Sequence, residues 1–365
     1  MRIRRDTRRR LDQFIANPSC NANVLSAVHD IPMVQVARSL GLPAEVGQSP
    51  FAISRGHTFE RTLYANEAER LFAALIRAGV LPAGAAGFVD LRLKVNGGSF
   101  REIDEARERF EGMLHGFARA SREERAALPS VIAAPALRIP GRAILPDGLF
   151  AVDVVTVHPQ GPLADGAPGP IVLRVGEIKV YPDRGGYTDP HELASTRAQA
   201  GVYVHALRLA VEAAGVGEAI RVATDGFLVL TRPGFNLPSV RANEDLRFQE
   251  QRAAEAFERL RKAAAEALPL DGDGPDVPDL RLAVVRAAPR AYDEACVSFC
   301  ELQADCHRRA LDAGEPSVLG RDVARFLGTI TLHRASALLG GAAATSSAEE
   351  DFLRRAGDAR RAGAA

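Results

Sequence analysis

The chain has 365 residues, enough for one large domain or two of ordinary size. Hydrophobic residues make up 47% and charged residues 25%, which argues against a disordered chain, and the apolar runs are too short to span a membrane. Basic and acidic residues number 46 each, so a nucleic-acid partner would need a local basic patch rather than a global charge. No apolar segment typical of a secretory signal follows the arginine-rich start, so we expect a cytoplasmic protein without a membrane partner.

In chain order, the first part of the sequence predicts helices. Apolar residues recur at the spacing of one helical face after Gly56, and again between Arg101 and Arg125. The second segment ends ahead of Pro129 and belongs to a helical insertion at about residues 83–128.

The periodicity changes after this insertion. Apolar and β-branched runs predict three strands, then a helix and a further strand: Val131–Ile139, Leu149–Val157, Ile171–Val180, His191–Ala214 and Phe227–Leu230. This order predicts an α/β fold, with a central mixed β-sheet flanked by helices and a core at about residues 130–235.

The remaining sequence predicts a helical segment at about residues 243–330, which carries three clustered cysteines. Residues 340–365 are rich in Ala, Gly, Ser and charge, so we expect a partly disordered tail there. We therefore expect one domain over residues 1–330.

Two of the predicted strands carry charged residues that an apolar sheet has to accommodate. Asp153 interrupts one strand, while Glu177 and Lys179 lie two apart on the next and project from the same face. A carboxylate buried there must be paired, hydrogen-bonded or metal-bound, because burying it alone costs several kcal/mol. If the strands pair, Asp153 and Glu177 converge, and their oxygens suit Mg²⁺ or Mn²⁺.

Two carboxylates and a lysine form a workable site for metal-assisted hydrolysis. The metal lowers the pKa of a bound water, and Lys179 orients or deprotonates that water. The chain has only three lysines, Lys94, Lys179 and Lys262, among its 46 basic residues, so a lysine beside Glu177 is an unusual choice. The structural alternative is a simple ion pair within the sheet.

Gln199 and Tyr203 lie four apart and therefore share one face of the next predicted helix. An Asp on a strand, a Glu-Ile-Lys triplet on the next and a helix with Gln-x-x-x-Tyr together resemble the PD-(D/E)xK nuclease superfamily, more narrowly its RecB-type branch. The resemblance implies a restriction-endonuclease-like core in which Asp153, Glu177 and Lys179 are catalytic. It also implies that Gln199 and Tyr203 contact the substrate backbone or brace the lysine.

The same branch has an upstream helix start, Gly-x-x-x-His-Glu, whose His binds metal. The corresponding stretch GHTFE has Phe59 at the position of that His, so His57 or Glu60 supplies the missing ligand. The family's Asp also has two candidates, because Asp147 follows a proline and spells the eponymous dipeptide in a predicted turn. We favour Asp153 because strand residues flank it.

Three further residues are candidates for binding substrate. Arg184 and Tyr187 lie in the loop that follows the Glu-Ile-Lys strand, and Tyr187 is able to stack on a base. Arg197 on the next helix is placed to contact a phosphate. A packing role for Tyr187 and an ordinary exposed position for Arg197 are the alternatives.

The chain has four cysteines, of which three cluster. Cys296 and Cys300 share a helical face, Cys306 follows, and Cys20 lies near the other end of the chain. In a cytosolic protein such a cluster favours a metal or redox site over disulfides. Four thiolates suit a tetrahedral Zn²⁺ ion or a [4Fe–4S] cluster, and buried unreactive cysteines are the alternative.

This arrangement is similar to that of the iron-staple nucleases, which include AddB-type helicase–nucleases and CRISPR-associated RecB-like exonucleases. The resemblance implies a structural [4Fe–4S] cluster that joins the N- and C-terminal segments, with structural Zn²⁺ as the alternative. The spacing here is C-x3-C-x5-C, whereas the family usually has C-x2-C-x5-C. A cluster that joins Cys20 to Cys306 would close a long loop and would therefore constrain the unfolded chain strongly.

The resemblance as a whole implies a metal-dependent DNA nuclease, an exonuclease acting on single strands or ends in repair or defence. Two other functions stay open. One is an iron–sulfur or zinc protein that binds nucleic acid with an inactive core. The other is a metal-dependent hydrolase of a substrate that is not a nucleic acid.

Overall fold

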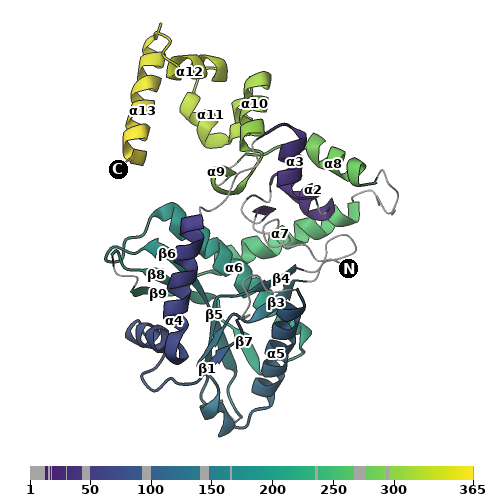
Figure 1. Cartoon of the computed structure of the whole chain (residues 1–365), viewed down its shortest axis with the longest axis vertical. Coiled ribbons are helices and arrows are strands. Elements are labelled where there is room, and N and C mark those ends of the chain that lie inside the picture. The colour runs from purple at the N-terminus through teal and green to yellow at the C-terminus, as the bar shows by residue number, and fades with distance from the viewer. Residues whose placement is uncertain are drawn as a thin grey trace. The chain divides into compact units, whose positions relative to one another are not determined.

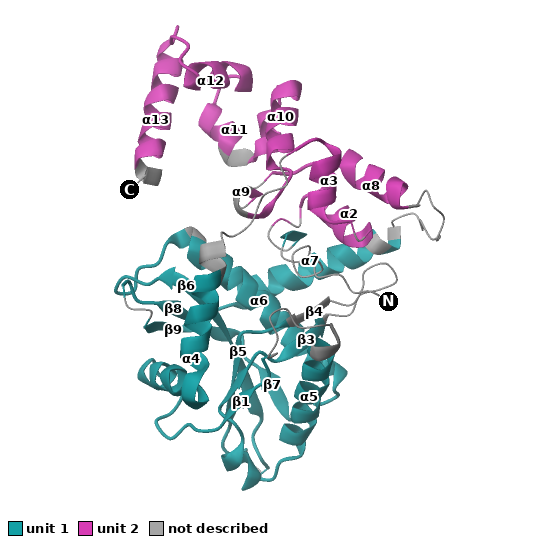
Figure 2. Ribbon diagram, viewed as in Figure 1, with its two compact units in different colours: residues 1–15, 48–266 teal, residues 16–47, 267–365 magenta. Residues whose placement is uncertain are grey.

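The computed structural model describes residues 13–14, 17, 19–29, 31–42, 50–92, 100–139, 148–164, 167–234, 237–266, 277–292 and 296–364. The chain divides into two compact units (Figure 2), where the sequence predicted a single domain over residues 1–330. The first unit comprises Met1–Ile15 and Gln48–Glu266, and the second comprises Ala16–Gly47 and Ala267–Ala365. No helix within the described ranges is long and apolar enough to cross a membrane.

The first unit is built on a seven-stranded mixed sheet (Figure 1). Its strands, in spatial order, are β1 (Phe88–Asp90), β2 (Val131–Ala133), β5 (Val154–Pro159), β6 (Ile171–Pro182), β8 (Asp225–Thr231) and β9 (Pro238–Asp245), and β7 (Ile220–Val222) pairs with the start of β6. The pairs β1–β2, β6–β7 and β6–β8 are parallel, and the other pairs are antiparallel. The predicted α/β class with a central mixed sheet is confirmed.

Each face of the sheet has its own apolar core, because side chains alternate along the strands. Val131 and Ala133 of β2 belong to one core, whereas Ile132 between them belongs to the other. The first core is covered by α4 (Pro50–Arg77), and the second contains residues of α5 (Phe100–Arg119), α6 (Pro190–Ala213) and α7 (Arg247–Glu266).

Two predicted strands are each broken in two. Ala134, whose φ of 51° lies in the left-handed region, and the following proline separate β2 from β3 (Ala136–Ile139). In the same way, Asp153 lies between β4 (Gly148–Ala151) and β5, and therefore at a break rather than within a strand. The strands β3 and β4 pair with each other in a separate two-stranded antiparallel sheet.

The sequence did not predict β1, β7 or β9. Within the predicted helical insertion at residues 83–128, β1 adds a parallel strand beside β2, ahead of α5. Three residues of β1 or β7 are too few to show a periodicity. The edge strand β9 is polar and half-buried along most of its length, so no apolar alternation marks it.

Helix α4 has an internal break. Asn66, Glu67 and Ala68 have φ angles of 51°, 56° and 60°, a region that residues with a Cβ rarely adopt. The break ends the first helical part just after Tyr64. Glu60 and Tyr64 therefore lie in the last turns of that part.

The helices described in the second unit contribute to two apolar clusters. One cluster unites α2 (Asn21–His29), α3 (Met33–Ser39) and α8 (Val277–Ala287) with the segment that carries the cysteines. The other cluster unites the helices α10 (Gln303–Ala313), α11 (Arg321–Leu327), α12 (Leu332–Leu339) and α13 (Ser347–Ala364).

The C-terminal residues differ from the expectation of a partly disordered tail at 340–365, because α13 forms there. Phe352 of α13 is buried in the second apolar cluster. Arg334 of α12 donates two hydrogen bonds of 2.7 Å to the carboxylate of Glu349, which also accepts from the Thr345 amide at 2.7 Å. One buried aromatic residue and a bidentate ion pair thus stabilise a helix that average composition does not predict.

Substitution by alanine should have opposite effects at two helical glycines, Gly201 and Gly116. A Cβ on Gly201 of α6 would lie 2.5 Å from Gln249 Cβ and 2.6 Å from the Gln249 carbonyl carbon in α7. Gly201→Ala should therefore lower the free energy of unfolding by about 1–3 kcal/mol, because α6 and α7 must move apart. Gly116→Ala in α5, where a Cβ meets nothing within 4 Å, should raise it by up to about 1 kcal/mol. Denaturant unfolding of both variants tests this, and wild-type stability of Gly201→Ala would contradict the close packing.

Candidate functional site

The break between β4 and β5 places Asp153 beside the middle of β6. The Ile178 amide donates to Asp153 Oδ2 at 2.8 Å. The Asp153 carbonyl accepts from the Ala134 amide at 3.0 Å and from the Tyr64 hydroxyl at 2.7 Å. Three separate segments therefore fix the side chain and the backbone of Asp153.

Glu177 and Lys179 lie together on β6, as their spacing predicts. Glu177 is fully buried, and its Oε1 lies 2.7 Å from Lys179 Nζ. Burial disfavours the charged ammonium, but Glu177 and then Asp153 outweigh this effect and raise the pKa of Lys179. Lys179 therefore carries a positive charge at neutral pH, which suits a role as a cation better than a role as a base.

Glu60 of α4 joins this group of charges. Burial raises the pKa of Glu60, the Asp153 carboxylate raises it further, and His57, Lys179 and Arg92 lower it. Of the two alternative ligands on α4, Glu60 is half-buried and His57 is exposed. The structure thus brings Glu60, Asp153 and Lys179 within electrostatic reach of one another.

Tyr64 and Arg92 adjoin Glu60, and sequence reasoning missed both. The Arg92 guanidinium lies 4.3 Å from the centroid of the Tyr64 ring, and Arg92 Nη2 lies 2.6 Å from Asp90 Oδ2. Tyr64 follows Glu60 by four residues on α4, a spacing that could have indicated it. No sequence pattern indicated Arg92, because its contact with Tyr64 depends on the pairing of the short strand β1 with the sheet.

The Gln-x-x-x-Tyr pair on α6 forms a direct contact. Gln199 Nε2 donates to the Tyr203 hydroxyl at 2.7 Å. Tyr203 is buried in the apolar core that contains residues of α5, α6 and α7. Arg197 of the same helix pairs with Glu244 of β9, its Nε donating to Oε2 at 2.6 Å. The Arg197 side chain is therefore engaged with the protein itself.

The loop after β6 makes a tight turn between Arg184 and Tyr187. The Arg184 amide donates to the Tyr187 carbonyl at 2.7 Å, and Gly185 and Gly186 have φ angles of 66° and 94°, as this turn requires. Tyr187 is 59% exposed, which leaves its ring open to a partner. The other candidate for the metal-binding Asp, Asp147, lies outside the described residues.

The four cysteines are buried free thiols of the second unit. Cys20, Cys296 and Cys300 belong to one apolar cluster. Burial, and next the neighbouring Cys20, raise the pKa of Cys306 to about 12. A hydrogen bond with Cys296 and burial raise the pKa of Cys300 as well, so Cys300 and Cys306 stay protonated at neutral pH without a metal.

Over the ranges that the structure describes, no three His, Cys, Asp or Glu side chains form a group that could hold a metal ion. Asp153 Oδ2 and Glu177 Oε1 instead contact the Ile178 amide and the Lys179 ammonium. Comparisons of the chain with known protein families, with curated proteins and with solved structures find no match. The chemistry of this site is therefore argued from its own residues.

The raised pKa of Glu60 predicts a pH-dependent stability. A carboxyl whose pKa is higher in the folded than in the unfolded state stabilises the fold below the unfolded pKa and loses this contribution as the pH rises through the folded pKa. Glu60→Gln cannot ionise, so it should have a higher melting temperature than the wild type at neutral pH in metal-free buffer. The difference should shrink as the pH falls toward the ordinary glutamate pKa. Thermal unfolding across this range measures the effect.

A matched control is Glu69→Gln, which removes an exposed carboxylate from the same helix. It should show no comparable gain. Melting temperatures of wild type and Glu60→Gln that differ by a constant amount at every pH would contradict the charge crowding at Glu60.

Proposed function

We propose that this protein is a metal-dependent nuclease of the PD-(D/E)xK type with a restriction-endonuclease-like core. We propose further that it hydrolyses phosphodiester bonds in DNA as an exonuclease on single strands or ends. One observation carries the proposal: Glu60, Asp153 and the Glu177–Lys179 pair interact although they come from a helix, a strand break and a strand. These elements follow one another along the chain in the order of the RecB-type motifs.

The residues that would hold Mg²⁺ or Mn²⁺ are Asp153, Glu177 and Glu60. Their oxygens are the ligands that these ions prefer, and burial and the Asp153 carboxylate raise the pKa of Glu60, an effect that a bound cation would offset. When bound, the ion would lower the pKa of a water and stabilise charge that develops on the phosphate.

Lys179 would orient the attacking water and stabilise negative charge on the phosphate, because it stays protonated beside Glu177. Gln199 and Tyr203 would brace the face of the sheet that α6 covers, or contact the substrate backbone. Their mutual hydrogen bond of 2.7 Å holds both side chains in place. In the turn beyond β6, the exposed Arg184 and Tyr187 are available to a phosphate and a base.

For the second unit, we propose that the four cysteines hold a structural [4Fe–4S] cluster, with Zn²⁺ as the alternative metal. The type of donor fits, because thiolates are the ligands of such clusters. All four cysteines of the chain are buried free thiols in one unit, and Cys306 interacts electrostatically with Cys20 and Cys296. When bound, the cluster would link the start of the chain to its C-terminal segment.

Replacement of Lys179 by alanine tests the nuclease proposal. Anaerobically purified wild type should degrade end-labelled linear DNA with Mn²⁺ or Mg²⁺, and Lys179→Ala should lose about 10²–10³-fold in rate. Lys262→Ala is a matched control, because this lysine is 65% exposed on α7 and pairs only loosely with Glu258, at 3.9 Å. Rates on single- and double-stranded substrates, and the ladder of products, give the substrate preference and the polarity.

The alternatives predict other results in the same assay. Wild type that binds DNA with a strong salt dependence, yet cleaves nothing with either metal, would identify a binding protein with an inactive core. Wild type that shows no DNA affinity even at low salt would point to a hydrolase of another substrate. Equal cleavage by wild type and Lys179→Ala would refute the assigned site.

Replacement of Cys20 by alanine tests the link between the chain ends. Cys20→Ala should lower the metal content per chain and the melting temperature together, because a ligand and a long-range closure are lost at once. Iron, sulfide and zinc analyses of anaerobically purified protein, run beside thermal unfolding, measure both. Full retention of metal and of stability would count against the staple.

A further inference from the structure

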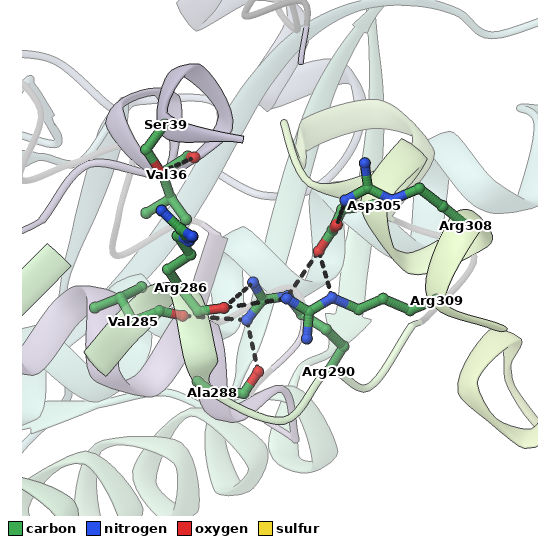
Figure 3. A network of polar contacts seen from close by, with 9 residues as sticks. All are labelled: Val36, Ser39, Val285, Arg286, Ala288, Arg290, Asp305, Arg308 and Arg309. Atoms are coloured by element: carbon green, nitrogen blue, oxygen red, sulfur yellow. Dashed lines mark hydrogen bonds and ion pairs between the residues drawn. The ribbon is translucent and has the colours of Figure 1, made fainter. Parts of the chain in front are cut away.

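Arg290 carries a buried positive charge in the second unit (Figure 3), where its side chain is 2% exposed. Its Nη1 donates to the carbonyls of Val285 at 3.1 Å and Ala288 at 2.7 Å, and its Nη2 donates to the carbonyl of Arg286 at 3.0 Å. These carbonyls lie at the C-terminal end of α8, where a cation is favourable. Arg290 therefore caps this helix from a position that water hardly reaches.

The counter-charge to Arg290 is Asp305 of α10, which is fully buried and shared by three arginines. Arg290 Nε lies 3.6 Å from Asp305 Oδ2, and Arg309 Nε lies 2.7 Å from the same oxygen. Arg308 pairs with the other oxygen, Oδ1. One carboxylate among three guanidinium groups leaves an excess of positive charge, and Arg290 is the most buried part of it.

This excess lies beside the cysteines. Cys306 follows Asp305 directly in α10, and Arg290 interacts electrostatically with the thiols of Cys306 and Cys20. Asp305 pairs with Arg308 and Arg309 as well, so the charge of Arg290 is incompletely compensated. In addition, its buried Nε makes no hydrogen bond.

A second contact connects the same loop to the cysteines. Asn17 Nδ2 donates to the carbonyl of Ala291, the residue after Arg290, at 2.7 Å, and it also lies 3.3 Å from Cys296 Sγ. Hydrogen bonds to cysteine sulfur are one of the means by which proteins tune iron–sulfur clusters. Asn17 thus connects the loop that carries Arg290 to Cys296.

A metal centre on four cysteinates would change the charge balance. An oxidised [4Fe–4S] cluster with its four thiolates bears a net charge of about −2, and reduction by one electron makes it more negative. A nearby buried cation favours the reduced form, because charges interact strongly where the dielectric constant is low. Arg290 would be such a cation for a cluster held by the four cysteines.

We propose that Arg290 supplies the buried positive charge that offsets the negative charge of a [4Fe–4S] cluster on Cys20, Cys296, Cys300 and Cys306, and thereby sets its reduction potential. The proposal rests on the cluster proposed above and not on nuclease activity. Arg290 would act on the potential of the cluster through its positive charge, and the negative charge of Asp305 would act in the opposite direction.

Three variants and a redox titration test this proposal. Anaerobic full-length protein is titrated with dithionite, which supplies the electron, while the visible absorbance of the cluster is followed. Arg290→Gln should shift the potential to more negative values and speed the loss of iron to a chelator. Asp305→Asn should shift the potential the opposite way, because it removes a buried negative charge while the side chain keeps a similar shape. Arg308→Gln is the matched control and should shift it least, since Arg308 is 52% exposed.

Arg290→Lys separates charge from shape. It keeps the positive charge but loses the forked hydrogen bonds to the end of α8, so it should keep the potential near the wild-type value while melting at a lower temperature. If Arg290→Gln does not fold, the positive shift in Asp305→Asn decides the question. A merely structural role for this network would not produce shifts of opposite sign.

Several results would overturn the proposal. These are a wild-type potential in both Arg290→Gln and Asp305→Asn, an equal shift in Arg290→Lys and Arg290→Gln, or wild-type protein that holds zinc or no metal at the cysteines. The nuclease proposal is judged separately. Protein that cleaves DNA without iron would refute the cluster, and with it the role of Arg290, but not the nuclease. Protein with the expected shifts but no cleavage would refute only the nuclease.

Discussion

The first unit depends on how β6 is completed beyond the end of its pairing with β5. The last paired residues are Val154 and Gly176, so the next available amide on that side of β6, that of Ile178, needs another partner. The Asp153 carboxylate supplies it at 2.8 Å, because the strand break turns this residue toward β6. The same break presents the Asp153 carbonyl to the Tyr64 hydroxyl at 2.7 Å, which ties α4 to the sheet. One interrupted strand thus determines where the charged residues meet.

How much of this site could be predicted depends on whether its residues share one element. Glu177 and Lys179 follow from strand alternation, and Gln199 and Tyr203 from helical spacing, since both periodicities are local. The break at Asp153 could not be predicted, because the apolar, β-branched residues around it read as one continuous strand. Contacts that depend on pairing between distant segments gave no sequence signal: the short strand β1, the edge strand β9 and the position of Arg92 beside Tyr64 are examples.

The zero net charge of the chain hides two local imbalances of opposite sign. In the first unit, three carboxylates lie within the electrostatic reach of Lys179 or of one another, while Arg92 is engaged by Asp90. In the second unit, three arginines share Asp305. Composition averages over both sites, which explains why the global charge said nothing about either one.

Such imbalances are unfavourable in a buried environment unless a ligand of the opposite sign completes them. The pKa of Glu60 is raised by burial and by Asp153, and the pKa of Arg290 is lowered by burial and by Arg309. The surroundings therefore disfavour the charged form of each group. A cation among the carboxylates and an anionic centre beside the arginines would each relieve this penalty. Because a ligand that binds only the folded state stabilises it, each unit would gain stability from its own ligand. The same charge imbalance would also disfavour a ligand of the wrong sign in each unit.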